Sequence, residues 1–207
     1  MRVTPVVAMR VGAFADTLRC ATYSSSRPRP VSAAAVTRDS SPPQPTTEAQ
    51  NTVMNQMLTL PLTETTALQA LRLSEDVWNA RDPARVARGY VEEGATRRRV
   101  ELFEGREAIK AFLRHKWQRE LDYRLVRELW SYTSHRIAAR FAAEWRDASG
   151  CWYRTSGHEI CEFDDDGLMR RRLACVCDTP IAWSDRKLLW PLGRRPDDHP
   201  SLTELGL

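Results

Sequence analysis

The sequence predicts an α+β domain in which the helices come first and an antiparallel sheet follows. Between Pro61 and Tyr123, apolar residues recur at helical spacing, whereas after Tyr123 they alternate with polar residues as in a strand. Helices and strands that are segregated along a chain are typical of the α+β class. We therefore expect residues 61–207 to form one domain built from helices packed on a sheet.

Three helices are expected before the sheet. Thr63 or Thr65 caps the first, Asp82 caps the second with Pro83 at its first position, and Gly105 opens the third. The apolar residues expected to face inward are Leu68, Leu71, Val77 and Trp78 in the first helix, Val86 and Tyr90 in the second, and Ile109, Phe112, Leu113, Trp117 and Leu121 in the third.

Four strands are expected at about 123–131, 136–146, 151–163 and 168–178, joined by short turns. Three consecutive hairpins give an antiparallel meander. Strands of this length bend, and a strongly curved sheet with a helix laid across its concave face makes a cone. Gly157, in the middle of the third segment, predicts a bulge at which that strand bends.

The segment from Thr179 to the C-terminus is rich in large apolar residues. It contains Trp183, Leu188, Leu189, Trp190 and Leu192. Because large apolar side chains are rarely left in water together, this segment is expected to pack on the domain or on a partner.

The net charge of +4 comes from the first 47 residues, which hold six arginines and two aspartates. The remaining residues carry 25 basic and 25 acidic side chains. This balance argues against a nucleic-acid-binding surface. No apolar run is long enough to span a bilayer, so no membrane association is expected.

Residues 1 to about 50 form a leader that is rich in Arg and Ser and poor in acids, and it contains no Lys. This composition is typical of a mitochondrial transit peptide. The alternative is a disordered Pro-rich extension that carries no targeting signal, on a cytoplasmic protein. Under either interpretation, the leader is expected to be dispensable for folding.

The five cysteines do not form a disulfide framework, and one of them, Cys20, lies in the leader. Cys175 and Cys177 share one face of a predicted strand, and Cys161 lies on a neighbouring one. Without a CxxC pair or nearby His spacing, small apolar fillers are favoured over a zinc site. No Gly-rich phosphate loop appears either, so neither a metal nor a cofactor is expected.

Several motifs resemble one superfamily. They are EDVWNARD from Glu75, GRE from Gly105, ELDYR from Glu120 and WPLGRRPDD from Trp190. They resemble the cone-shaped, cystatin-like fold shared by nuclear transport factor 2, SnoaL-type polyketide cyclases, ketosteroid isomerase and scytalone dehydratase, and in particular an uncharacterised, mostly bacterial SnoaL-like family. The resemblance implies one deep pocket, but unrelated functions use this scaffold.

The chain departs from that family at three places. Residues 96–99 are Thr-Arg-Arg-Arg where the family has Trp-Arg-Asn-Arg, and residues 156–163 and 175–178 also lose Asn and aromatic residues. Such residues would line a polar, aromatic pocket. Either this protein binds a different ligand or it has lost the ancestral function, and the sequence does not separate the two.

Relatives in the superfamily use one Asp or His in an apolar cone for proton transfer, which makes His158 the candidate base here. The alternative places His158 on the outer face of the sheet, because residues alternate sides along a strand. Asp178 ends the last predicted strand, where some cyclases of this fold have their base. It is equally suited to capping the turn before Pro180.

Other residues are candidates for the pocket wall. Trp78 and Asn79 lie where dehydratase relatives have polar pocket residues, although Trp78 also fits a core position. Arg97 and Arg99 alternate with Thr96 and Arg98, so that one pair points inward and could bind a carboxylate or an enolate. The aromatic residues Trp117, Tyr123 and Trp145 suit a planar apolar ligand and suit an ordinary core equally well.

The resemblance implies a cofactor-independent lyase, isomerase or cyclase that acts on a small organic molecule by proton transfer. The alternative is a non-catalytic ligand-binding or assembly module of the same fold. A homodimer is also expected, because the convex face of a curved sheet otherwise exposes apolar surface, which relatives commonly bury against a second copy.

Overall fold

The computed structural model describes residues 58–207. The predicted leader, residues 1–50, lies outside this part of the chain, so its transit function stays a prediction. Every helix within residues 58–207 is too short or too polar to serve as a membrane span.

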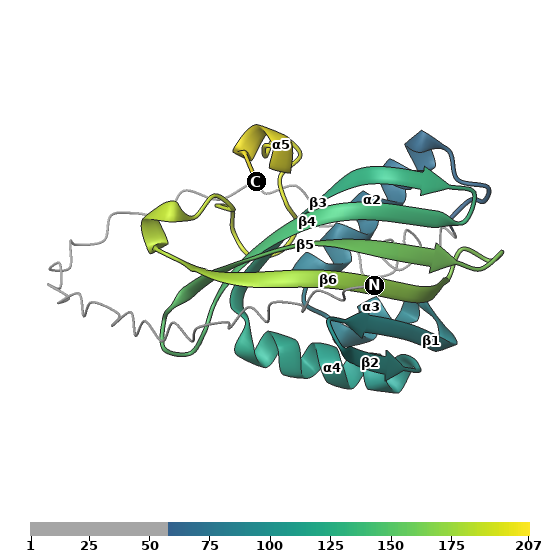
Figure 1. The fold of residues 1–207 in the computed structure, drawn as a ribbon, viewed down its shortest axis with the longest axis horizontal. Helices are drawn as coiled ribbons and strands as arrows, with labels where there is room; N and C mark the ends of the chain where they lie inside the picture. Colours follow the sequence, from purple (N-terminus) through teal and green to yellow (C-terminus); the bar gives the residue numbers. More distant parts are fainter. Residues whose placement is uncertain (1–57) are drawn as a thin grey trace, which may run out of the picture. The chain divides into compact units, whose positions relative to one another are not determined.

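Three helices precede the main strands, as predicted (Figure 1). Helix α2 (Glu64–Asn79) is capped by Thr63, whose hydroxyl accepts a hydrogen bond from the Thr66 amide, so Thr63 rather than Thr65 is the cap. Helix α3 (Pro83–Arg88) is capped by the Asp82 carboxylate. Helix α4 (Arg106–Arg119) follows Gly105, whose φ of 81° explains the glycine.

The sheet has six strands in the order β2-β1-β6-β5-β4-β3. The four predicted strands are confirmed as β3 (Leu121–Thr133), β4 (Arg136–Arg146), β5 (Trp152–Phe163) and β6 (Met169–Ile181), which pair as antiparallel hairpins. The cone-shaped α+β fold is therefore confirmed.

Two strands were not predicted. Strand β1 (Tyr90–Arg98) runs parallel to β6, and the short β2 (Glu101–Glu104) pairs with β1, so the sheet is mixed rather than purely antiparallel. Tyr90 begins β1, so its predicted place in the second helix is wrong. The dense charge of this segment hides the alternation that would have revealed a strand.

Gly157 lies at a close approach rather than at a bulge. The pairing of β5 with both neighbours continues through it without a register shift. A Cβ at this position would lie 2.3 Å from the Cys175 carbonyl oxygen and 2.9 Å from Cζ of Phe141. The glycine therefore makes room for its neighbours. The register shifts lie elsewhere in the sheet: between Leu121 and Arg124 and between Leu129 and Ser131 in β3, between Glu162 and Phe163 in β5, and between Tyr90 and Ala95 in β1.

The two faces of the sheet are covered differently. On the inner face, α2 packs against β3 and α4 closes the cone, with Trp78, Ile109 and Leu113 in the core between them. On the outer face, the C-terminal segment, with the 3-10 turn η1 (Trp183–Asp185) and helix α5 (Leu202–Leu205), packs on β3 and β4. There it buries its own Leu188, Trp190 and Leu202 together with Val126 and Ala142.

Candidate functional site

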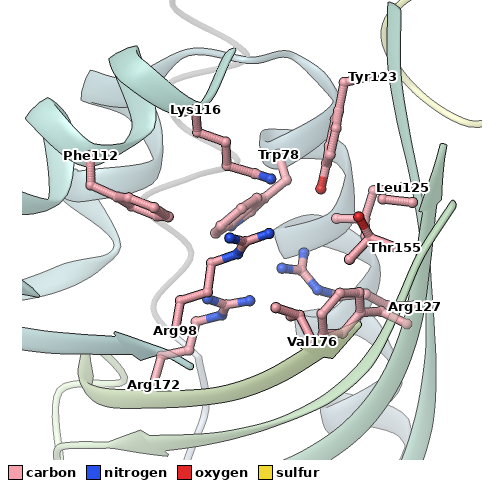
Figure 2. Close-up of a pocket in the computed structure, with 12 residues that line it drawn as sticks. Trp78, Arg98, Phe112, Lys116, Tyr123, Leu125, Arg127, Thr155, Arg172 and Val176 are labelled. Atoms are coloured by element: carbon pink, nitrogen blue, oxygen red, sulfur yellow. The ribbon is translucent and has the colours of Figure 1, made fainter. Parts of the chain in front are cut away.

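A small cavity lies inside the cone, between the inner face of the sheet and helices α2 and α4. Its volume is about 20 Å³, which is room for about one water molecule. The lining residues are Trp78, Arg98, Phe112, Lys116, Tyr123, Leu125, Arg127, Phe141, Ala143, Thr155, Arg172 and Val176. Figure 2 shows that the nitrogen-bearing ends of the three arginines and of Lys116 converge on the centre of this space.

The deep wall of the cavity is a closed ionic cluster. The Glu159 carboxylate accepts hydrogen bonds from Nε of Arg127 at 2.7 Å and from Nε of Arg172 at 2.6 Å, and all three side chains are buried. Burial alone would raise the pKa of Glu159, but the two arginines outweigh it and hold that pKa below its ordinary value. Both guanidinium groups also lie over the Trp78 ring, so this wall is rigid and internally paired.

The mouth of the cavity is built differently. Lys116 Nζ pairs with Oε2 of Glu120, and a guanidinium nitrogen of Arg98 lies 3.9 Å from Oε1 of the same carboxylate. A second carboxylate, Asp178, lies 3.8 Å from Arg98. Within residues 58–207, no hydrogen bond joins the Arg98 guanidinium to another residue. Arg98 is therefore the cavity cation whose hydrogen-bonding capacity is left for a ligand.

Burial lowers the pKa of Lys116 to about 8, against the opposing effect of Glu120. The neighbouring Arg98 adds to the lowering, because two like charges disfavour each other at short range. A lysine with this pKa has a substantial neutral fraction near physiological pH, and it can therefore both accept and donate a proton.

The charges around the cavity do not balance. Four cationic side chains line it, whereas the two carboxylates buried beside them are Glu120 and Glu159. Asp178 lies at the margin, where it accepts hydrogen bonds from the Thr155 hydroxyl at 2.6 Å and from Arg99 at 2.6 Å. The interior of the cone consequently suits an anion.

The structure brings several predicted pocket residues together. Trp78 and Tyr123 line the cavity. Trp117 packs edge-on against both of them, and Trp145 donates a hydrogen bond to the cavity residue Thr155, so these two tryptophans form a layer behind the wall. Asp178 lies beside the cavity without lining it.

Asn79 has a different part in the structure. It is buried, its amide donates to the Leu125 carbonyl at 2.9 Å, and its own oxygen accepts from the Leu125 amide at 2.8 Å. Asn79 therefore joins α2 to β3 and does not reach the cavity.

Three predicted positions need correction. His158 is exposed and alternates along β5 with the inward residues Gly157 and Glu159, so it lies on the outer face. Arg97 is exposed for the same reason, because Thr96 and Arg98 take the inward positions of β1. Arg99 lies beyond the end of that strand, where it pairs with Asp178 outside the cavity.

Most of the charged cavity residues were not predicted. Lys116 and Glu120 are four residues apart on a helix, which is the spacing of an intrahelical ion pair. Such pairs are usually on the surface, so this signal alone does not place the pair inside. Arg127, Glu159 and Arg172 occupy inward strand positions, but charged residues in strands are ordinarily assigned to the solvent side. Within residues 58–207, no group of His, Cys, Asp and Glu side chains is arranged to hold a metal ion.

The comparisons with known proteins agree with this fold. The epoxide hydrolase/cyclase-like enzyme SalBIII, described in pyran ring formation in the polyether salinomycin, superposes with a TM-score of 0.50 and 12% identity over 55% of this chain and 92% of its own. A protein of unknown function from Exiguobacterium sp. 255-15, described as like nuclear transport factor 2, has a TM-score of 0.46 and 19% identity over 55% and 99%.

A SnoaL-like protein of unknown function from Burkholderia thailandensis E264 has a TM-score of 0.46 and 20% identity over 56% of this chain and 98% of its own. No curated protein matches the chain. A family model does match residues 60–189, which include every residue that lines the cavity. The chain therefore belongs to the family described as protein of unknown function DUF1348.

Proposed function

We propose that the cone binds a small organic anion and transfers one of its protons without a cofactor, as a lyase, isomerase or cyclase does. The observation that carries this proposal is the Arg98 guanidinium, which faces a cavity with more cations than carboxylates and forms two ion pairs of 3.8 and 3.9 Å but no hydrogen bond within residues 58–207. An oxyanion or carboxylate would supply the missing hydrogen-bond acceptor, and guanidinium geometry matches both.

Lys116 is the group that would move the proton. Its amine lies at the cavity, its pKa of about 8 is near the working pH of a cell, and Glu120 is positioned to exchange the proton with it. Arg98 would stabilise the negative charge that develops on a carbonyl oxygen when the neighbouring carbon loses its proton. The cyclase-like description of SalBIII is compatible with such chemistry on this scaffold.

The size of the cavity limits how a ligand enters. About 20 Å³ does not hold an organic molecule, so side chains at the mouth have to move. Arg98, Phe112 and Val176 are the partly exposed members of the wall, whereas Arg127 and Arg172 are fixed by Glu159. Entry past Arg98 would bring the anion directly to its binding partner.

A second candidate is a non-catalytic ligand-binding or assembly module. The small cavity and the paired wall around Glu159 favour it, because a cluster whose charges are paired with one another can serve only to stabilise the fold. In both candidates the cavity binds an organic anion, but only the first candidate converts that anion into a product.

An untargeted metabolite screen with the purified protein separates the two candidates. We expect one or more carboxylic acids to be consumed by the wild type and by His158→Ala, but not by Lys116→Met. Retention of an acid without conversion by all three proteins would favour the binding module. Equal turnover by Lys116→Met would remove Lys116 from the mechanism.

A further inference from the structure

An amine and a guanidinium share one carboxylate at the mouth of the cavity. Lys116 reaches one oxygen of Glu120 and Arg98 lies 3.9 Å from the other, so both cations lie beside the same carboxylate group. A ligand that meets both would offer an electrophilic centre to the amine and an anionic centre to the guanidinium. A 2-oxo acid has this pattern, with a carbonyl next to a carboxylate.

Lys116 also has the environment of a nucleophilic amine. Its side chain is buried, a second cation lies nearby, and Trp78, Phe112 and Tyr123 supply apolar surface around it. Desolvation and a neighbouring cation are the two features that make a lysine amine reactive toward carbonyl groups. Surface lysines, which remain protonated, do not have this reactivity.

We propose that Lys116 forms an imine with the carbonyl carbon of a small 2-oxo acid whose carboxylate is bound by Arg98. This inference rests on the proposed function, since it uses the same anion site. It adds a covalent step and names the class of substrate.

The step balances with the groups present. Glu120 takes one proton from the ammonium group, and the amine then attacks the carbonyl carbon, so that a C–N bond forms and the carbonyl electron pair moves to oxygen. A second proton passes from nitrogen to that oxygen and gives the carbinolamine. Glu120 returns its proton to the hydroxyl group, which leaves as water, and the nitrogen lone pair closes the C=N bond. The protonated imine then acidifies the neighbouring C–H bond.

The lysine content of the chain makes the imine easy to locate. The whole sequence has three lysines, at positions 110, 116 and 187. Lys110 lies on the same helix as Lys116 but pairs with the exposed Glu107, and Lys187 donates a hydrogen bond to the Leu205 carbonyl. These two lysines are internal controls for non-specific labelling.

The test is borohydride reduction of the full chain in the presence of pyruvate or phenylpyruvate, followed by peptide mass spectrometry. Because the neutral fraction of an amine rises as its pKa falls, we expect Lys116 to be labelled at least about tenfold more than Lys110 or Lys187 at neutral pH. Lys116→Arg should abolish this label, and Lys110→Arg should leave it unchanged. Lactate and phenyllactate, which have a hydroxyl group in place of the ketone carbonyl, should bind without labelling Lys116.

Calorimetric titration of the same acids distinguishes the possible failures. If 2-oxo and 2-hydroxy acids bind but Lys116 is not labelled above the other lysines, the imine is overturned and the anion site stands. If none of these acids binds, both the imine proposal and the proposed anion site are overturned for this class of ligand. Labelling of Lys116 that survives Arg98→Gln without loss of affinity would overturn the assignment of Arg98 as the carboxylate partner.

Discussion

The two faces of the sheet show how neighbouring residues of one strand acquire opposite environments. In β1, Arg98 points into the cavity and Arg97 into solvent. In β5, Glu159 is buried between two arginines, whereas the adjacent His158 is exposed. The residue type therefore does not decide which side chain belongs to the site. Position on the inner or outer face decides it, and a one-residue shift would exchange the two sets.

The outer face is itself divided. Over β3 and β4 the C-terminal segment covers it and buries Val126 and Ala142, but Ile160 on β5 is 46% exposed, and Cys175 and Cys177 on β6 are also exposed. The inner face is charged and enclosed, while this part of the outer face is weakly polar and open. Neighbouring substitutions on the two faces should consequently have different effects.

The largest difference is expected between Glu159→Gln and His158→Gln. Removing the Glu159 charge leaves Arg127 and Arg172 buried without their anion, which typically costs about 3 kcal/mol or more of the free energy of unfolding. His158 is exposed, so its substitution should change that free energy by less than about 0.5 kcal/mol. Urea denaturation of both variants measures the difference. Equal stabilities would show that the ionic cluster does not stabilise the inner face.

The next effect concerns Lys116 and pH. In the folded protein its pKa is about 8, against an ordinary value of 10.5, so the unfolded chain binds more protons at this position between these pH values. The stability contributed by the neutral amine is therefore complete above the ordinary value and is lost as the pH falls through about 8. The free energy of unfolding of the wild type, relative to Lys116→Met, should rise by on the order of 2 kcal/mol across this window.

Denaturation of both proteins at several pH values measures this slope. A difference that does not vary with pH would show that Lys116 is fully solvated in the folded state.

The sequence predicts the helices and strands of this fold better than it predicts which side chains face the interior. Helix caps such as Thr63 and Asp82 and the alternation along β3 to β6 are local signals, and the structure has these elements. The inward side of a strand is a tertiary property, so the sequence left open whether His158 faces the pocket, whereas in the structure Glu159 takes the inward position and His158 the outer one. Gly157 added to the uncertainty, because a bulge predicted at this glycine would have changed which side chains face inward, whereas the structure has a close approach to the Cys175 carbonyl there.

The charged site was missed for a related reason. Trp78 and Tyr123 were found because aromatic residues are expected inside a domain. Arg127, Arg172 and Lys116 are expected outside, and they are stable inside because Glu159 and Glu120 accompany them from strand β5 and from the end of helix α4. The pairing of Arg127 and Arg172 with Glu159 depends on contacts between distant parts of the chain, which no local pattern records. The Lys116–Glu120 spacing is local, but it does not place that pair inside the domain.

A smaller effect is expected from Arg98→Gln compared with Arg97→Gln. Arg98 has no hydrogen-bonded carboxylate within residues 58–207, so its loss should change the free energy of unfolding little. If Arg98 binds the anion, the affinity for a carboxylic acid should fall about tenfold or more, because a charge-assisted hydrogen bond is lost. Calorimetric titration measures this change, and Arg97→Gln is the control on the opposite face of the same strand. Equal losses in both variants would indicate general electrostatics rather than a binding site.

The smallest effect on the stability of the protomer is expected at Ile160, where the homodimer predicted from the sequence is tested. We propose that the uncovered half of the outer face pairs with a second copy, because Ile160 is an apolar side chain that the C-terminal segment leaves open. Ile160→Glu should convert a dimer into a monomer in light scattering at micromolar concentration, since a carboxylate in such an interface would be buried without a partner. The stability of the protomer should change by less than about 0.5 kcal/mol. Leu68→Glu is the matched control, because Leu68 is 48% exposed but lies on helix α2. A wild-type protein that is already monomeric, or a dimer that survives Ile160→Glu, would show that the open half of the outer face is not the interface.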